Sequence, residues 1–197
     1  MPETVQLPQL QLKDLTTAIM GSRTRFEPDA DLDPTEYVKL WHEEESWNGT
    51  VHKAITVVLR TRGCTWDYNH GCTMCGYFNE TAHKKITDEQ LLAQWQRVLA
   101  QHKDETILKI YTGGNFLDVA EVMDNVQRTI VSEGSKRFKL IMVESRPEYC
   151  TQERLGMLSA LAAENGGEIL IAIGLESSSD EVCDKAINKG YAFKEFV

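Results

Sequence analysis

The sequence contains no apolar run long enough to cross a bilayer. Its most hydrophobic stretches, Ala54 to Leu59 and Ile169 to Ile173, have the length of β-strands, whereas a membrane-spanning helix needs about 20 apolar residues. The N-terminus, MPETVQLPQLQL, lacks the basic region and apolar run of a secretory signal. These absences argue against a membrane protein and predict a cytoplasmic location.

Positive charge is also scarce. The chain has 21 lysines and arginines against 30 aspartates and glutamates, and its formal net charge is −9. An acidic chain has no overall attraction for a phosphate backbone. A nucleic-acid substrate would therefore need a local basic patch or the help of a partner.

Cysteine is sparse and unevenly placed. Of the five cysteines, Cys64, Cys72 and Cys75 fall within a dozen residues, while Cys150 and Cys183 stand alone. Disulfides are rare in cytoplasmic proteins, and an odd number with one tight cluster is typical of metal ligation. The cluster predicts a metal centre, and the two lone cysteines are interpreted as structural thiols.

Segments typical of strands and helices alternate along most of the chain. Apolar, β-branched segments predict strands at 54–62, 106–112, 138–145 and 168–176. Amphipathic segments predict helices at 89–102, 119–133, 152–164 and 180–187. This alternation favours parallel strands joined by right-handed helical crossovers. We therefore expect an α/β fold over residues 51–197, with about four parallel strands and covering helices.

Residues 1–50 predict a separate, helical N-terminal extension. One short helix is expected within residues 12–26, and a second within residues 29–45, with Asp33 as its N-cap and Pro34 at its first position. At the other end, four parallel strands without closing strands predict that the α/β fold is truncated at the C-terminus.

The chemically notable residues directly follow the predicted strands. Cys64 follows the first strand, and the motifs TGGN (112–115), ESRP (144–147) and LESSS (175–179) end or follow the other three. The carboxyl ends of parallel strands share one edge, and ligands bind there in α/β folds. We therefore expect one common site.

The segment RTRGCTWDYNHGCTMCGYFNE allows three interpretations. Three thiolates bound to a cubane [4Fe–4S] cluster leave one iron open to another ligand. The same cysteines with His70 or His83 could form a structural zinc site, and unliganded thiols are the third interpretation. Placement at the end of a parallel strand favours the cluster.

The order of these motifs resembles the radical-SAM superfamily, whose members cleave S-adenosylmethionine (SAM). The commonest spacing there is C-x3-C-x2-C, and the wider gap between Cys64 and Cys72, with ESRPEY and IGLESSSDEVCDKAINKGYAF, resembles the branch that includes the catalytic subunit of Elongator. Within it, RTRGCTWDYNHGCTMCGY looks most like the archaeosine-biosynthesis radical-SAM lyases of archaea. The resemblance runs from about Leu59 to the end and implies a partial (βα) radical-SAM barrel.

This resemblance implies roles for individual residues. Cys64, Cys72 and Cys75 would ligate three irons of a [4Fe–4S] cluster, and SAM would bind the fourth and be cleaved reductively. Contacts to SAM are implied for Met74, Tyr77, Thr112, Gly113, Gly114, Asn115, Glu144, Ser145, Glu176 and Ser177. Each also has a purely structural interpretation, as a loop hydrophobe, a turn residue or a solvated charge. Asn115 stands where many relatives carry an acidic residue.

The resemblance also implies an activity. It is the lyase step that converts a lysine-bearing 7-deazaguanine base in tRNA to archaeosine, with archaeosine synthase as protein partner and an electron donor. Two alternatives remain: another Elongator-like radical-SAM enzyme acting on tRNA or a small molecule, and a non-catalytic zinc-binding module.

Overall fold

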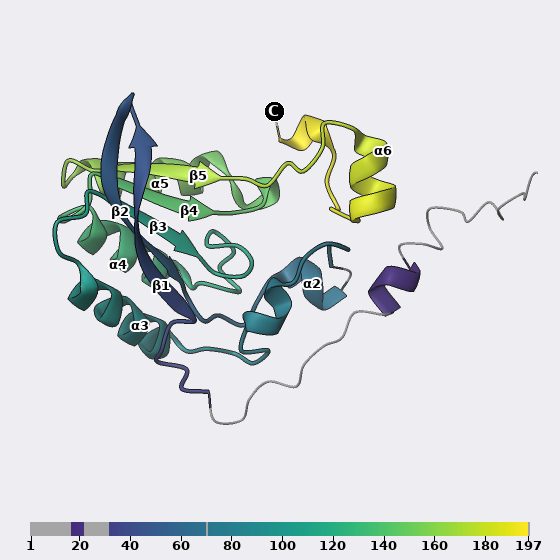
Figure 1. The fold of residues 1–197 in the computed structure, drawn as a ribbon, viewed down its shortest axis with the longest axis horizontal. Coiled ribbons are helices and arrows are strands. Elements are labelled where there is room, and N and C mark those ends of the chain that lie inside the picture. Colours follow the sequence, from purple (N-terminus) through teal and green to yellow (C-terminus); the bar gives the residue numbers. More distant parts are fainter. Residues whose placement is uncertain (1–16, 22–31, 70, 197) are drawn as a thin grey trace, which may run out of the picture.

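The computed structural model describes residues 17–21, 32–69 and 71–196. A five-stranded sheet with the order β1-β2-β3-β4-β5 forms its centre (Figure 1). The strands are β1 (Lys39–Trp47), β2 (Thr50–Val58), β3 (Ile107–Tyr111), β4 (Leu140–Glu144) and β5 (Glu168–Ala172). The helices are α2 (Thr65–Asn69), α3 (Asp88–Gln101), α4 (Asp124–Gly134), α5 (Gln152–Ala163) and α6 (Asp180–Val182), which a π-helical turn (Cys183–Ile187) continues.

The four strands β2 to β5 are parallel, and α3, α4 and α5 form the crossovers between them. This confirms the α/β fold that the alternating pattern predicts. At the start of α3 the Thr87 hydroxyl accepts a hydrogen bond from the Gln90 backbone N–H and so caps the helix.

The long helices lie on one face of the sheet. Successive strands step across the sheet in one direction, so right-handed crossovers bring every helix to the same side (Figure 1). Alternate strand residues face these helices and form the core with them: Ile55, Val57, Leu108, Ile110, Ile141, Val143, Trp95, Ile130 and Leu158. A single layer of helices on a stepwise parallel sheet is how βα units begin a barrel. Whether the sheet belongs to a radical-SAM barrel stays a prediction.

The prediction of a helix within residues 29–45 is wrong. Residues 39–47 form β1, which pairs antiparallel with β2 along its whole length. Asn48 and Gly49 connect the two strands with φ angles of 51° and 77°, which is the left-handed pair that a two-residue hairpin turn requires. Pairing with β2 therefore overrides the helical signals of Asp33 and Pro34, which lead into a turn.

Little else of the expected N-terminal extension lies within the described residues. Residues 17–21 form a short helical turn, inside the helix expected at 12–26. The rest of that helix lies outside the described residues. Within the described part of the chain, no helix combines the length and the apolar character needed to span a bilayer.

Candidate cofactor-binding site

A pocket of about 320 Å³ lies at the carboxyl ends of the parallel strands. Its lining includes loop residues after β2 and β3, the end of β4 with the residues after it, and the segment after β5. The motifs that follow the four predicted strands therefore meet at one place, because parallel strands end at the same edge.

All three clustered cysteines line this pocket as free thiols. The backbone N–H of Cys75 bonds to the carbonyl of Cys72 at 3.2 Å, which makes the tight turn that brings the pair together. Among the described residues, no three His, Cys, Asp or Glu side chains are grouped so that they could hold a metal ion. The three thiols therefore line one pocket without being grouped closely enough to hold a single metal ion.

Burial lowers the acidity of Cys64 and Cys72. It raises the pKa of Cys64, and it raises the pKa of Cys72 to about 11, although the positive charges of Lys189 and Arg146 act in the opposite direction. The charges of Cys75 and Cys64 also raise the pKa of Cys72, so Cys72 lies within electrostatic reach of both other cysteines. Thiols of this kind become ligands only when a metal replaces their protons.

The segment after α6 holds the cysteine loop in place. The Thr73 backbone N–H donates to the Ile187 carbonyl at 2.9 Å, and the Asn188 side chain donates to the Gly71 carbonyl at 2.7 Å. The indole N–H of Trp66 donates to the Asn188 carbonyl at 2.9 Å. Chain segments more than 110 residues apart therefore close one side of the pocket together.

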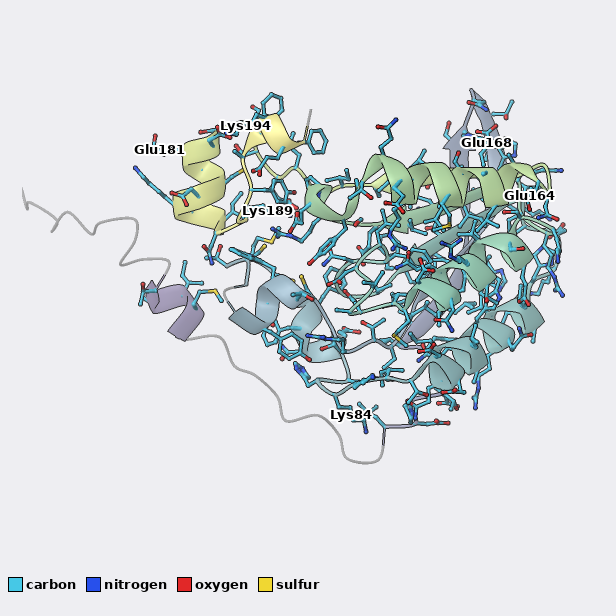
Figure 2. The ribbon with its side chains drawn as sticks, turned by 180° about the vertical axis from the view of Figure 1, so that it is seen from behind. Lys84, Glu164, Glu168, Glu181, Lys189 and Lys194 are labelled. Atoms are coloured by element: carbon cyan, nitrogen blue, oxygen red, sulfur yellow. The ribbon has the colours of Figure 1, made fainter. Side chains whose placement is uncertain are left out.

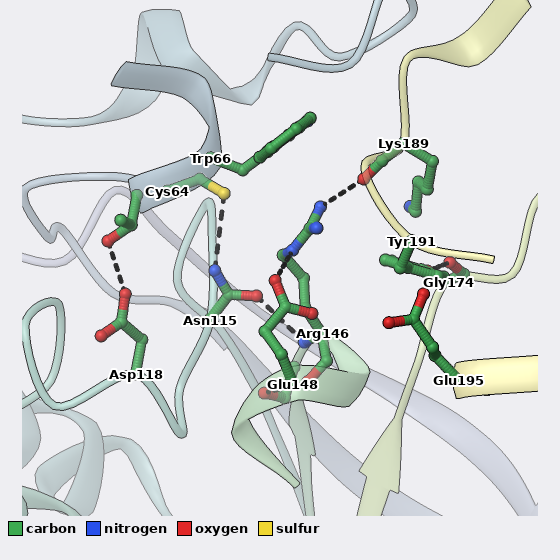
Figure 3. A network of polar contacts seen from close by, with 12 residues as sticks. Cys64, Trp66, Asn115, Asp118, Arg146, Glu148, Gly174, Lys189, Tyr191 and Glu195 are labelled. Carbon is green, nitrogen blue, oxygen red and sulfur yellow. Dashed lines mark hydrogen bonds and ion pairs between the residues drawn. The ribbon is translucent and has the colours of Figure 1, made fainter. Parts of the chain in front are cut away.

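Arg146 forms a cationic wall of the pocket (Figure 3). Its guanidinium lies 5.0 Å from the ring centres of both Trp66 and Tyr191, and it donates to the Lys189 carbonyl at 2.7 Å and to the Glu148 carboxylate at 2.5 Å. Cation–π contacts and a planar donor fork suit arginine better than lysine. Arg146 consequently connects Trp66, in the helix that follows Cys64, to Lys189 and Tyr191 in the segment after α6.

Lys189 places a second positive charge on the same wall. Its ammonium group forms an ion pair with Glu176 at 3.0 Å, and only 11% of the side chain is exposed. In Figure 2, Lys189 lies beside the C-terminal helix that carries Glu181, whereas Lys84 lies on the opposite side of the fold. His83, Lys84 and Lys85, the basic run nearest to the cysteines in the sequence, do not line the pocket.

The turn after β3 fits tightly against the first cysteine. A Cβ atom on Gly114 would lie 2.2 Å from the Glu121 carboxylate and 2.7 Å from the Cα atom of Cys64, so only glycine fits there. The side-chain N–H of Asn115 donates to the Cys64 sulfur at 3.4 Å (Figure 3).

Two carboxyl groups, of the partly buried Glu144 and the fully buried Glu121, support this turn. Glu144 accepts the Thr112 backbone N–H at 2.8 Å, and burial raises its pKa to about 7. Glu121 accepts the Thr61 hydroxyl and the Asn115 backbone N–H, both at 2.6 Å, and burial raises its pKa to about 8.

Most of the residues predicted to contact SAM lie at the pocket. Eight of the ten line it: Met74, Tyr77, Gly113, Gly114, Asn115, Glu144, Ser145 and Glu176. Met74 and Tyr77 are 57% and 55% exposed and present apolar surface to solvent. Thr112 and Ser177 are not part of the lining: Thr112 is buried behind the turn, and the Ser177 hydroxyl accepts the Ser179 backbone N–H.

The structure also brings in residues that the sequence did not single out. Trp66, Lys189 and Tyr191 line the pocket. The only sequence signal for Trp66 is its position two residues after Cys64. Lys189 and Tyr191 follow Asn188, whose left-handed backbone (φ 55°) ends the C-terminal helical segment.

The fold and the site thus define an α/β protein with a three-cysteine pocket at the carboxyl ends of its parallel strands. The chain is similar to archaeosine synthase subunit beta of Methanosarcina acetivorans, with 34% identity over 188 residues, 93% of this chain and 53% of that protein. It is also similar to archaeosine synthase subunit beta of Thermococcus kodakarensis, with 29% identity over 163 residues, 80% of this chain and 50% of that protein.

An uncharacterized protein of Methanocaldococcus jannaschii is 29% identical over 174 residues, 84% of this chain and 47% of that protein. The chain spans about half the length of these curated relatives. No family model and no solved structure matches it.

Proposed function

We propose that this chain carries the cluster and most of the SAM site of a radical-SAM lyase that acts on tRNA in archaeosine biosynthesis. The main observation behind this proposal is that Cys64, Cys72 and Cys75 all line one pocket beyond the carboxyl ends of the parallel strands. The names of two similar proteins support the pathway.

The donor set fits a [4Fe–4S] cluster. Thiols are the usual ligands of such clusters, and all three cysteines line the same pocket. Cys64, Cys72 and Cys75 would hold it. When bound, the cluster would supply the electron that cleaves SAM.

The remaining walls suit a charged cofactor with an apolar part. Lys189 and Arg146 offer positive charge to a carboxylate, and Glu176 and Glu144 offer oxygen acceptors to an ammonium or to hydroxyl groups. Met74 and Tyr77 offer apolar surface on the open side. The pocket volume of about 320 Å³ lies at the lower end of the range for small-molecule sites.

Recognition of tRNA would depend on a partner in this proposal. The net charge of −9 gives the chain no general attraction for RNA. The word subunit in the names of the two relatives implies that those proteins assemble with another chain. We infer that archaeosine synthase would be this partner here, and that it would supply RNA binding.

Anaerobic reconstitution with iron and sulfide tests the cluster. The wild-type chain and Cys150→Ala should bind iron and sulfide in equal amounts, because Cys150 does not line the pocket, whereas Cys72→Ala should lose most of both. Reduced protein given SAM should release 5′-deoxyadenosine. A colourless chain that keeps one tightly bound zinc would refute the proposal and favour the zinc-binding module.

The pathway needs a separate test. Lysine-modified tRNA, the partner synthase and the reduced chain should yield archaeosine in nucleoside mass spectrometry. An unchanged nucleoside alongside active SAM cleavage would leave the radical-SAM proposal standing and favour another Elongator-like reaction.

A further inference from the structure

Asn115 is a fully buried side chain whose orientation is fixed by its hydrogen bonds. Its oxygen accepts the Arg146 backbone N–H at 3.0 Å. A backbone N–H can only donate, so the amide oxygen must face Arg146 and the amide nitrogen must face away from it. That nitrogen lies 3.4 Å from the Cys64 sulfur (Figure 3).

The surrounding turn leaves this amide little freedom. The Asn115 backbone N–H is bonded to the buried Glu121 carboxyl group at 2.6 Å, and its carbonyl accepts the Asp118 backbone N–H at 3.2 Å. Gly114 lies directly against the Cys64 backbone. The hydrogen bond to sulfur is therefore built into the fold of the ligand-free protein.

We propose that Asn115 is a positioning residue that donates a hydrogen bond to the Cys64 thiolate and thereby raises the reduction potential of the cluster. The inference rests on the proposed function, since it needs the cluster. Hydrogen bonds to cysteine sulfurs are one of the factors that set cluster potentials, because they stabilise the more negative, reduced state. The resemblance implied that Asn115 contacts SAM, but here the amide donor is already directed at a cluster ligand.

Two substitutions distinguish the hydrogen bond that the Asn115 side chain donates to Cys64 from the one that it accepts from Arg146. Asn115→Asp keeps an oxygen for the Arg146 N–H and replaces the donor to sulfur by a negative charge. Asn115→Leu removes both functions at similar volume. Asn125→Asp adds the same charge at an exposed position in the first turn of α4, away from the pocket, and is the matched control.

The measurement is an EPR-monitored redox titration of the reconstituted chains without SAM, at matched iron content. At a fixed potential the ratio of reduced to oxidised cluster should fall by up to about tenfold in Asn115→Leu, because the potential shifts by the difference in hydrogen-bond strength between the two redox states; tenfold corresponds to about 59 mV for a one-electron couple. It should fall further in Asn115→Asp and stay unchanged in Asn125→Asp.

A potential equal to that of wild type in either Asn115 variant, once its cluster is assembled, overturns the inference. An unchanged potential with weaker SAM binding also overturns it and returns Asn115 to a SAM contact. If the wild-type chain itself takes up no cluster, it is the proposed function that fails, and the inference fails with it.

Discussion

Replacing Glu121 by glutamine should change how the stability of this fold depends on pH. The carboxyl group is fully buried, and its burial outweighs the hydrogen bonds from Thr61 and Asn115 and raises its pKa from 4.5 to about 8. The folded state therefore binds more protons than the unfolded state between these two values, so stability falls as the pH rises through this window. From pH 5 to pH 9 the loss amounts to about 4 kcal/mol.

Glu121→Gln should not lose this stability between pH 5 and pH 9, because the glutamine side chain stays neutral. Its amide offers one acceptor instead of two, so Glu121→Gln should be less stable than wild type at pH 5 by about 1 kcal/mol. At pH 9 it should be the more stable protein. Urea unfolding of the metal-free proteins at pH 5, 7 and 9 measures both differences.

Glu153→Gln, at an exposed position on α5, is the matched control. Its stability should follow that of wild type at all three pH values. Parallel stability curves for wild type and Glu121→Gln would refute the reasoning, because they would mean that the buried carboxyl group ionises as easily in the folded protein as in the unfolded chain.

Three further substitutions test the local geometry. Gly114→Ala should destabilise the fold by about 1–3 kcal/mol in urea unfolding, because its Cβ would overlap the Glu121 carboxylate. The control Gly156→Ala, with open space around it on α5, should be neutral or stabilising. Equal effects of the two substitutions on stability would contradict the tight fit at Gly114. Gly49→Ala should cost about 1 kcal/mol or more in thermal unfolding because of its positive φ, and an unchanged melting temperature would argue against the hairpin turn. Asn188→Gly keeps the left-handed backbone but removes the bond to the Gly71 carbonyl, so hydrogen exchange at residues 71–76 should become faster, and an unchanged rate would show that this bond does not hold the loop.

Local sequence patterns were enough for the parallel part of the fold. The segments that became β2 to β5 are short, apolar and β-branched, and the segments between them have the 3.6-residue period of amphipathic helices; both signals depend only on near neighbours. The hairpin was missed for the opposite reason. The acidic stretch around Glu43 to Glu45 has the composition of a helix surface, and only pairing with β2 makes it a strand. The Asn48-Gly49 turn was the available signal.

The sequence by itself determined where the candidate site lies: three cysteines follow a buried strand and polar motifs follow the next strands, and parallel pairing brings them to one edge. Only the tertiary structure decided what encloses that edge. Lys189 and Tyr191 reach the pocket because the chain after α6 returns to the cysteine loop. The orientation of Asn115 toward Cys64 likewise depends on Arg146, 31 residues away. Contacts between residues so far apart in the chain produce no periodic pattern in the sequence. They depend on how the helices and strands pack, and not on the residues next to them in the chain.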